Sequence, residues 1–224
     1  MCIRDREHPS TLTTVGHLGL LFRNKGDYEQ AEMYYERDLE ASGRMLGPEH
    51  PSTLTTINNL GGLFHCKGSY EQAEAYYMQA LEAKERLLGP EHPSTLITVG
   101  NLGQLYSDKF DYEQAEAYLK RGLEASERLL GPEHPSTLTT VGNLGLLYLH
   151  KGHYEQAEAY LKRDLEASER LLGPEHPSTL TTVGNLGLLY LHKGHYEQAE
   201  AYLKRDLEAS ERLLGPEHPS TLTT

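Results

Sequence analysis

Apolar residues recur at helical spacing through most of the chain, and residues 131–172 show the pattern most clearly. One stripe of this segment consists of Leu138, Val141, Leu144, Gly145 and Tyr148. Its steps of three, three, one and three keep these positions on one side of a helix with 3.6 residues per turn. The stripe predicts an amphipathic helix that begins near Pro135 and ends at Gly152.

A second helix is predicted in the remainder of the segment, and it ends at Gly173, where glycine accepts a left-handed backbone. The predicted inner face of this helix consists of Tyr154, Ala157, Leu161, Leu165 and Leu172. Its predicted outer face consists of Glu155, Glu158, Lys162, Arg163 and Glu169. At the start of the first helix, Pro135 suits the first helical position, and His134 or Ser136 is the expected cap. The segment thus predicts a helix-turn-helix pair.

This pair recurs with a period of 42 residues, marked by the string GPEHPSTLTT or a close variant. We expect five repeats over residues 7–46, 47–88, 89–130, 131–172 and 173–214. The last two are identical, and the earlier ones differ increasingly, as recent duplication explains. A single pair cannot bury its own apolar face, so the repeats are expected to stack on one another.

Both ends of the chain depart from the repeat. Residues 1–6, MCIRDR, match no later segment and read like one frame of a sequencing-library adapter, so we interpret them as a non-native leader. Residues 215–224 match the start of the pair, and we interpret them as the truncated, frayed beginning of a sixth repeat. Both interpretations describe the chain as a fragment.

The motif Leu144-Gly145-x-x-Tyr148, followed by Tyr154-x-x-Ala157-x-x-x-Leu161, resembles the tetratricopeptide signature. The 42-residue length and the long second helix closed by LLGPEHP are similar to the repeats of kinesin light chains. The resemblance implies an all-α fold, a right-handed α–α superhelix whose inner wall is made by the first helix of each pair. Gly145 and Ala157, the small residues of the motif, suit a close crossing of the two helices, where a larger side chain would destabilise the fold by about 1–3 kcal/mol.

In this family the inward residues of the first helix form a peptide groove, and the resemblance carries that role to the matching positions here. The candidate groove residues are Asn59, Asn101, Asn143, Asn185, Thr139, Thr181, Leu146, Leu149, Leu188, Leu191, His150, His192, Gln104, Ser107 and Asp108. Leu146 and Leu149 lie off the stripe that packs on the second helix, so we expect them to be partly exposed as a binding surface. Packing between neighbouring repeats is the alternative.

The asparagines among these residues recur once per repeat on the same predicted wall. An amide donates and accepts hydrogen bonds at once, so a ladder of amides suits the backbone of an extended peptide. The family uses similar asparagines in this way. The alternative is an asparagine that bonds only to its own or the adjacent helix.

The third and fourth repeats differ at seven positions, and four of these are groove positions: Ile97 for Thr139, Gln104 for Leu146, Ser107 for Leu149 and Asp108 for His150. One repeat has six predicted groove positions, which in the fourth repeat are Thr139, Gly142, Asn143, Leu146, Leu149 and His150. Seven changes spread at random over 42 positions would place about one in this set of six. We therefore interpret the groove as the faster-diverging surface. It is expected to be apolar from Leu146 to Leu191 and polar around Gln104, Ser107 and Asp108.

Composition then excludes several classes of function. The chain of 224 residues has no apolar run long enough to cross a bilayer, so no membrane partner is expected. Its formal net charge of −12 leaves no basic stripe for nucleic acid. The two cysteines lack CxxC or metal-type spacing, which favours a reducing, cytoplasmic setting.

No catalytic motif interrupts the repeats. A nucleophile motif, a glycine-rich phosphate loop and an acid pair outside the repeated pattern are all missing, so neither an enzyme nor a cofactor is expected. His150 and His153 flank a turn and recur as His192 and His195, but a third metal ligand is lacking. We interpret them as polar turn residues.

Two functional hypotheses of different class follow. The first is a non-enzymatic scaffold that binds a protein or peptide ligand, with asparagines on the ligand backbone and apolar pockets at Leu146, Leu149, Leu188 and Leu191. The alternative is a structural spacer, or a self-associating regulatory array of a larger multidomain protein. Replacing Asn143 and Asn185 by alanine discriminates between the two.

Overall fold

The computed structural model describes residues 9–214, and within that range every regular element is an α-helix. The first helices of the pairs are α1 (Pro9–Asn24), α3 (Pro51–Cys66), α5 (Pro93–Asp108), α7 (Pro135–His150) and α9 (Pro177–His192). The second helices are α2 (Tyr28–Met45), α4 (Tyr70–Leu88), α6 (Tyr112–Leu130), α8 (Tyr154–Leu172) and α10 (Tyr196–Leu214). The predicted leader and the predicted start of a sixth repeat lie outside the described residues.

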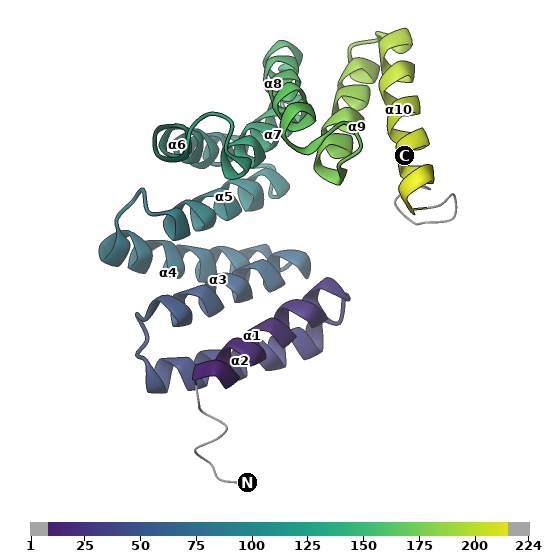
Figure 1. Cartoon of the computed structure of the whole chain (residues 1–224). Coiled ribbons are helices and arrows are strands. Elements are labelled where there is room, and N and C mark those ends of the chain that lie inside the picture. Colours follow the sequence, from purple (N-terminus) through teal and green to yellow (C-terminus); the bar gives the residue numbers. More distant parts are fainter. Residues whose placement is uncertain (1–8, 215–224) are drawn as a thin grey trace. The chain divides into compact units, whose positions relative to one another are not determined.

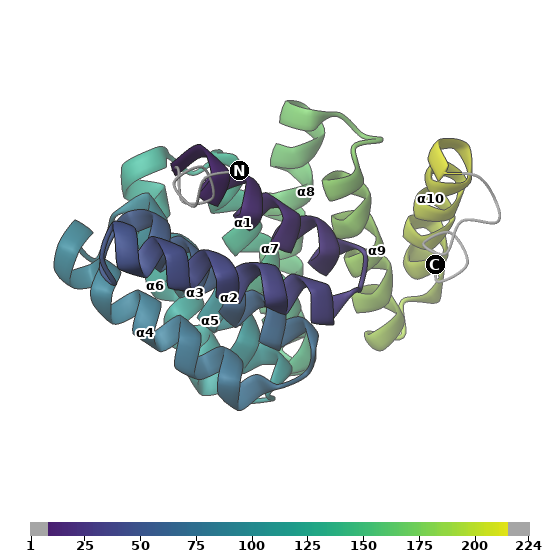
Figure 2. The ribbon, with the colours of Figure 1, turned by 90° about the horizontal axis from the view of Figure 1, so that it is seen from below.

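The chain divides into two compact units, Met1–Asp111 and Tyr112–Thr224. In the first unit α1 to α5 pack one on the next in chain order, and α1 contacts α3 while α3 contacts α5 (Figure 1). In the second unit α6 to α10 pack in the same order, and α7 contacts α9. Figure 2 shows from below how α10 runs alongside α9. The second helices α2, α4 and α8 therefore each pack between the first helix of their own pair and the first helix of the next pair.

The first helices from α3 to α9 start in the same way. A histidine is the N-cap, proline takes the first helical position, and the histidine Nδ1 accepts a hydrogen bond of 3.2 Å from the backbone N–H of the serine two residues later. These caps are His50, His92, His134 and His176. Of the two predicted caps in the fourth repeat, His134 is the correct one.

The turn between pairs is fixed by a threonine in the first turn of the next helix. Thr137 Oγ1 donates to the Gly131 carbonyl at 2.9 Å, and Thr179 Oγ1 donates to the Gly173 carbonyl at the same distance. Gly173 has a φ of 95°, which residues with a side chain rarely adopt. The connection is thus held by local contacts that the repeated string itself encodes.

The predicted apolar stripe of the fourth repeat forms the core between α7 and α8. Val141 and Leu144 are fully buried, and so is Ala157 on α8. A Cβ on Gly145 would lie 2.7 Å from the Leu161 side chain, which confirms the close crossing. Leu172 is an exception, because it is 42% exposed rather than part of the inner face.

Candidate functional site

A cavity of about 280 Å³ lies between α7, α8 and α9 in the second unit. The candidate groove residues that line it are Thr139, Asn143, Leu146, Thr181 and Asn185. Thr139 and Thr181 are exposed, and each donates to a carbonyl one turn back in its own helix, at 3.0 Å. The structure therefore brings residues from two successive first helices to one concavity.

The first unit contains an equivalent cavity of about 500 Å³ between α1, α2 and α3. Asn59 lines it from α3, whereas α1 presents His17 at the position that is asparagine in the other repeats. Thr55 and Leu20 occupy the matching threonine and leucine positions. The same geometry thus arises at two junctions between helix pairs.

The four candidate asparagines differ in their hydrogen bonding. Asn59, Asn143 and Asn185 are half-buried, and within the described part of the chain their side-chain amides make no hydrogen bond. Asn101 Nδ2, in contrast, lies 3.4 Å from Oδ1 of Asn58 on the neighbouring first helix. The alternative interpretation, a bond to the adjacent helix, therefore holds for Asn101.

The floor of the cavity in the second unit is a carboxylate that the sequence did not point out. Asp164 on α8 is only 7% exposed, and Thr182 Oγ1 on α9 donates to its Oδ2 at 2.5 Å. Ser168 Oγ donates to Oδ1 at 3.4 Å. Burial raises the pKa of the Asp164 carboxyl, although the hydroxyl donors oppose the shift. This carboxylate links α8 to the next helix pair.

The cavity of the first unit has the same floor. Asp38 on α2 is 7% exposed and accepts a hydrogen bond from Thr56 Oγ1 on α3 at 2.5 Å. Burial raises the pKa of the Asp38 carboxyl as well. The signal in the sequence was the recurrence of an aspartate 18 residues before a threonine at Asp38 and Thr56 and again at Asp164 and Thr182.

The junction between α4 and α5 carries the opposite charge. Ala80 stands where the two junctions just described have Asp38 and Asp164, and Lys84 stands where they have Ser42 and Ser168. Lys84 is 3% exposed, and its Nζ donates to Thr98 Oγ1 at 2.9 Å and to the Ser94 carbonyl at 3.1 Å. Burial lowers the pKa of this ammonium to about 8. A buried cation therefore replaces the buried anion beside the equivalent threonine.

The leucines of the predicted groove are exposed to different degrees. Leu146 is half-buried and lines the cavity, whereas Leu188 and Leu191 on α9 are 45% and 46% exposed. Leu149 is only 7% exposed, so its predicted partial exposure is wrong. It lies on α7, against which α9 packs. The burial of Leu149 favours the alternative, packing between neighbouring repeats.

Two residues of the predicted polar middle of the groove, Gln104 and Asp108, form a cluster with His65 in the first unit. Asp108 Oδ2 lies 2.7 Å from His65 Nε2 on the preceding first helix, and Gln104 Nε2 donates to Asp108 Oδ1 at 3.0 Å. Ser107 is buried at 6% exposure, like its counterpart Leu149.

The candidate histidines lie near the turns of the second unit. His150 is exposed, and His192 stacks on Tyr154 of the preceding pair with ring centroids 6.2 Å apart. Among the described residues no three His, Cys, Asp or Glu side chains are grouped as metal ligands would be. What these histidines offer is aromatic and polar contact surface.

Comparison with known proteins identifies the repeat. The sequence profile of the tetratricopeptide repeat matches residues 10–86, 56–128, 108–166 and 154–208. The chain belongs to the tetratricopeptide repeat family. Its all-α repeat solenoid, which the resemblance to the tetratricopeptide signature implied, is thereby confirmed. The comparison with curated proteins gives no match.

Solved structures with this tetratricopeptide fold include BtubC (BKLC) from P. vanneervenii, with a TM-score of 0.78 and 24% identity over 96% of this chain and 87% of the other. A Podosopora anserina putative kinesin light chain with nearly identical repeats has a TM-score of 0.75 and 24% identity over 92% and 97%. Rap protein complexed with Competence and Sporulation Factor has a TM-score of 0.75 and 16% identity over 93% and 61%. At these identities the likeness concerns the fold.

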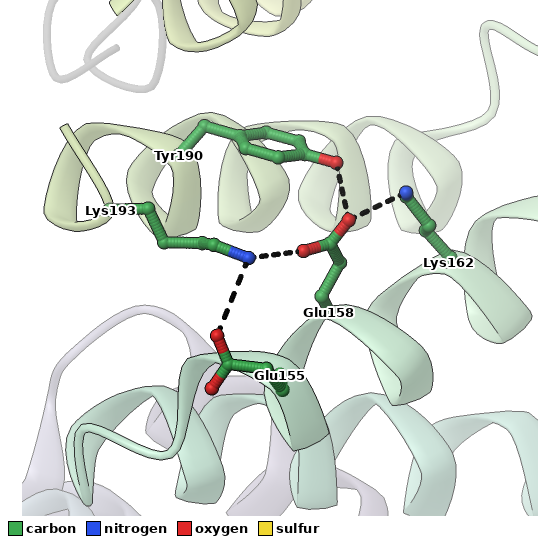
Figure 3. Close-up of polar contacts among 5 residues, drawn as sticks. All are labelled: Glu155, Glu158, Lys162, Tyr190 and Lys193. Atoms are coloured by element: carbon green, nitrogen blue, oxygen red, sulfur yellow. Dashed lines mark hydrogen bonds and ion pairs between the residues drawn. The ribbon is translucent and has the colours of Figure 1, made fainter. Parts of the chain in front are cut away.

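Tetratricopeptide pairs of this chain are joined to one another by a glutamate that was predicted to lie on the outer face. Glu158 on α8 accepts hydrogen bonds from the Tyr190 hydroxyl at 2.9 Å, from Lys193 Nζ at 2.6 Å and from Lys162 Nζ at 2.6 Å (Figure 3). Hydrogen bonds from Lys162 and Lys193 lower the pKa of the Glu158 carboxyl to about 2. Glu158 thus fastens α8 to α9.

The same contact recurs at two other tetratricopeptide junctions. Glu74 accepts from the Tyr106 hydroxyl at 2.9 Å and from Lys109 Nζ at 2.6 Å. Glu116 accepts from the Tyr148 hydroxyl at 2.9 Å and from the ammonium of Lys151.

None of the described helices is both long enough and apolar enough to span a bilayer.

Proposed function

We propose that this chain is a non-enzymatic protein-binding scaffold, which holds an extended peptide or disordered segment against the first helices of its repeats. The observation that carries the proposal is the cavity between α7, α8 and α9. It is lined by Asn143 and Asn185, whose amides have no hydrogen-bond partner within the described part of the chain. Half-buried amides without partners are available to a ligand.

The chemistry of the cavity suits a main chain in extended conformation. Asn143 and Asn185 occupy equivalent positions one repeat apart, and each amide offers one acceptor and two donors. Leu146 lies half-buried beside them, so an apolar ligand side chain has a surface to cover. Backbone hydrogen bonds supply affinity in this mode, and side-chain pockets supply specificity.

Two structurally similar proteins support a peptide as the ligand class. One is Rap protein, solved in complex with Competence and Sporulation Factor, and the other is NprR in complex with its cognate peptide NprX, with a TM-score of 0.70. The proposal places this chain in the cytoplasm, which its small number of cysteines favours.

A peptide-display selection tests the proposal. We expect peptides to be enriched on the wild type and lost on the Asn143→Ala/Asn185→Ala variant, with circular dichroism showing that both remain helical. The matched control is Gln156→Ala/Gln198→Ala, which removes two exposed amides from the second helices. Equal enrichment on wild type and asparagine variant, or none on either, contradicts the proposal and leaves the spacer or self-associating array.

A further inference from the structure

Asp38 and Asp164 are buried carboxylates that line cavities. Each is 7% exposed, and in the described part of the chain neither has an ion-pair partner. The threonine hydroxyls that donate to them, from Thr56 and Thr182, are neutral. Buried carboxylates are usually paired with a cation, because burial without one is unfavourable.

The cavity gives access to this carboxylate from the side of the candidate groove. Asp164 contributes to its lining together with Leu171 and Leu172, which are 47% and 42% exposed. A Cβ on Gly142 would lie 3.2 Å from Asp164 Oδ2, so the glycine leaves the side of this oxygen that faces α7 free of a side chain. The combination of apolar wall and anionic floor matches a side chain with an aliphatic stem and a charged head.

We propose that the cavities floored by Asp164 and Asp38 each bind one cationic side chain, the ammonium of a lysine or the guanidinium of an arginine, on the ligand. This proposal rests on the proposed function, because the cation is supplied by the bound peptide. The carboxylate accepts hydrogen bonds from the cationic head, and the leucines cover its stem. A charge-assisted hydrogen bond at a desolvated site is stronger than one between neutral groups.

The junction between α4 and α5 differs from this floor at three positions. Where the fourth repeat has Gly142, Asp164 and Ser168, the second has an asparagine, an alanine and a lysine, namely Asn58, Ala80 and Lys84. There the ammonium of Lys84 donates to Thr98 Oγ1, whereas the hydroxyl of Thr98 donates to Asn58 Oδ1 at 2.9 Å. The equivalent threonine therefore faces a cation of the chain itself. A ligand cation is repelled at this junction and an anion is favoured.

A small cation tests the charge of the cavity without any peptide. The probe is butylguanidinium, with 1-pentanol as the neutral comparison, and binding is followed by saturation-transfer NMR on the probe because the identical fourth and fifth repeats give overlapping protein signals. We expect butylguanidinium to bind saturably and 1-pentanol to show no saturable binding. Asp38→Asn/Asp164→Asn is expected to weaken it about tenfold, since hydrogen bonds to charged groups are the stronger ones. Equal binding of both probes, or unchanged cation binding in the variant, overturns the proposal.

A second test copies the floor of the second repeat into the fourth. The variant Asp164→Ala/Ser168→Lys recreates the pair Ala80 and Lys84 in the cavity of the second unit. Among displayed peptides that need Asn143 and Asn185, we expect the wild type to enrich lysine or arginine and the variant to enrich aspartate or glutamate at the corresponding position. The same charge preference on both proteins overturns the proposal.

The two tests separate this inference from the proposed function. Peptides that depend on the asparagines but show no cationic residue overturn the inference and leave the scaffold standing. A cation probe that binds through Asp164, without any asparagine-dependent peptide, supports the cation-binding cavity and contradicts the peptide scaffold. Circular dichroism of each variant checks that the helices persist. If the lysine variant does not fold, Asp38→Asn/Asp164→Asn, which preserves the shape of both floors, takes its place in the peptide selection, and loss of the preference for lysine or arginine is then the expected result.

Discussion

Lys193 Nζ on α9 lies 2.6 Å from Glu158 Oε2 on α8, and the carboxylate also accepts the Tyr190 hydroxyl (Figure 3). One side chain thus holds two neighbouring helix pairs together. We expect Glu158→Gln to lower the free energy of unfolding by about 1 kcal/mol, because the charge-assisted bonds become neutral ones. Urea unfolding followed by circular dichroism measures the change.

The control for this variant is Glu155→Gln. Glu155 is 87% exposed on its side chain and lies 3.9 Å from Lys193 Nζ, so its neutralisation is expected to change stability by less than about 0.5 kcal/mol. Equal effects of the two variants would show that Glu158 contributes nothing beyond surface charge.

The low pKa values of Glu116 and Glu158 predict lability in acid. Both carboxyls have a folded-state pKa lowered from 4.5 to about 2, chiefly by hydrogen bonds from Lys120 and Lys151 to the first and from Lys162 and Lys193 to the second. Their stabilising contribution is therefore complete above pH 4.5 and is lost as the pH falls towards about 2. The variant Glu116→Gln/Glu158→Gln should show a shallower loss of stability over this range, measured by urea unfolding at successive pH values. An identical slope in the variant would contradict the assignment.

Lys84 predicts a pH dependence of the opposite kind. Its pKa is lowered by burial from 10.5 to about 8, so between these values the unfolded chain binds more protons than the folded one. Stability therefore gains a contribution from this group as the pH rises through that window. Lys84→Met should be more stable at pH 7 by about 1 kcal/mol, because a buried charge is replaced by an apolar side chain. The difference between variant and wild type, followed by thermal unfolding, should shrink towards high pH, and a constant difference would refute the prediction.

Gly145 and Gly100 form a matched pair of helical glycines. A Cβ on Gly145 would lie 2.7 Å from Leu161, whereas a Cβ on Gly100 meets nothing within 4 Å. We expect Gly145→Ala to destabilise the protein by about 1–3 kcal/mol through overpacking, and Gly100→Ala to stabilise it by about 0.5–1 kcal/mol through helix propensity. Calorimetric unfolding of both variants checks the opposite signs. Stabilisation by both variants would mean that backbone propensity alone decides, and destabilisation by both would contradict the prediction for Gly100.

The helix pairs were predictable because their signals are local. The spacing of the apolar stripe defines which side of a first helix packs on its own second helix, and a histidine before proline marks where the helix begins. His134 and Gly145 act as the sequence predicts, since each depends on neighbours within the same repeat.

Contacts between repeats were predicted less well, because periodicity within one helix does not say what the next repeat covers. Leu149 and Leu191 occupy identical sequence surroundings, yet one is 7% and the other 46% exposed. Glu158 and Asp164 were not recognised as junction residues, since a charged position on an amphipathic helix usually faces solvent. Their partners, Lys193 and Thr182, belong to the following helix pair.

The threonine that donates to the glycine carbonyl of each turn has a consequence for the number of pairs a chain of this kind can carry. Thr95, Thr137 and Thr179 each reach a glycine six residues earlier, at 2.9 Å. Any insertion of one 42-residue repeat therefore brings its own turn glycine, its own capping histidine and one of the two partners in each contact to a neighbouring pair. An unequal crossover between the two identical copies, residues 131–172 and 173–214, adds or removes a whole pair and leaves every remaining interface chemically unchanged, so the length of the array can be adjusted by copy number alone.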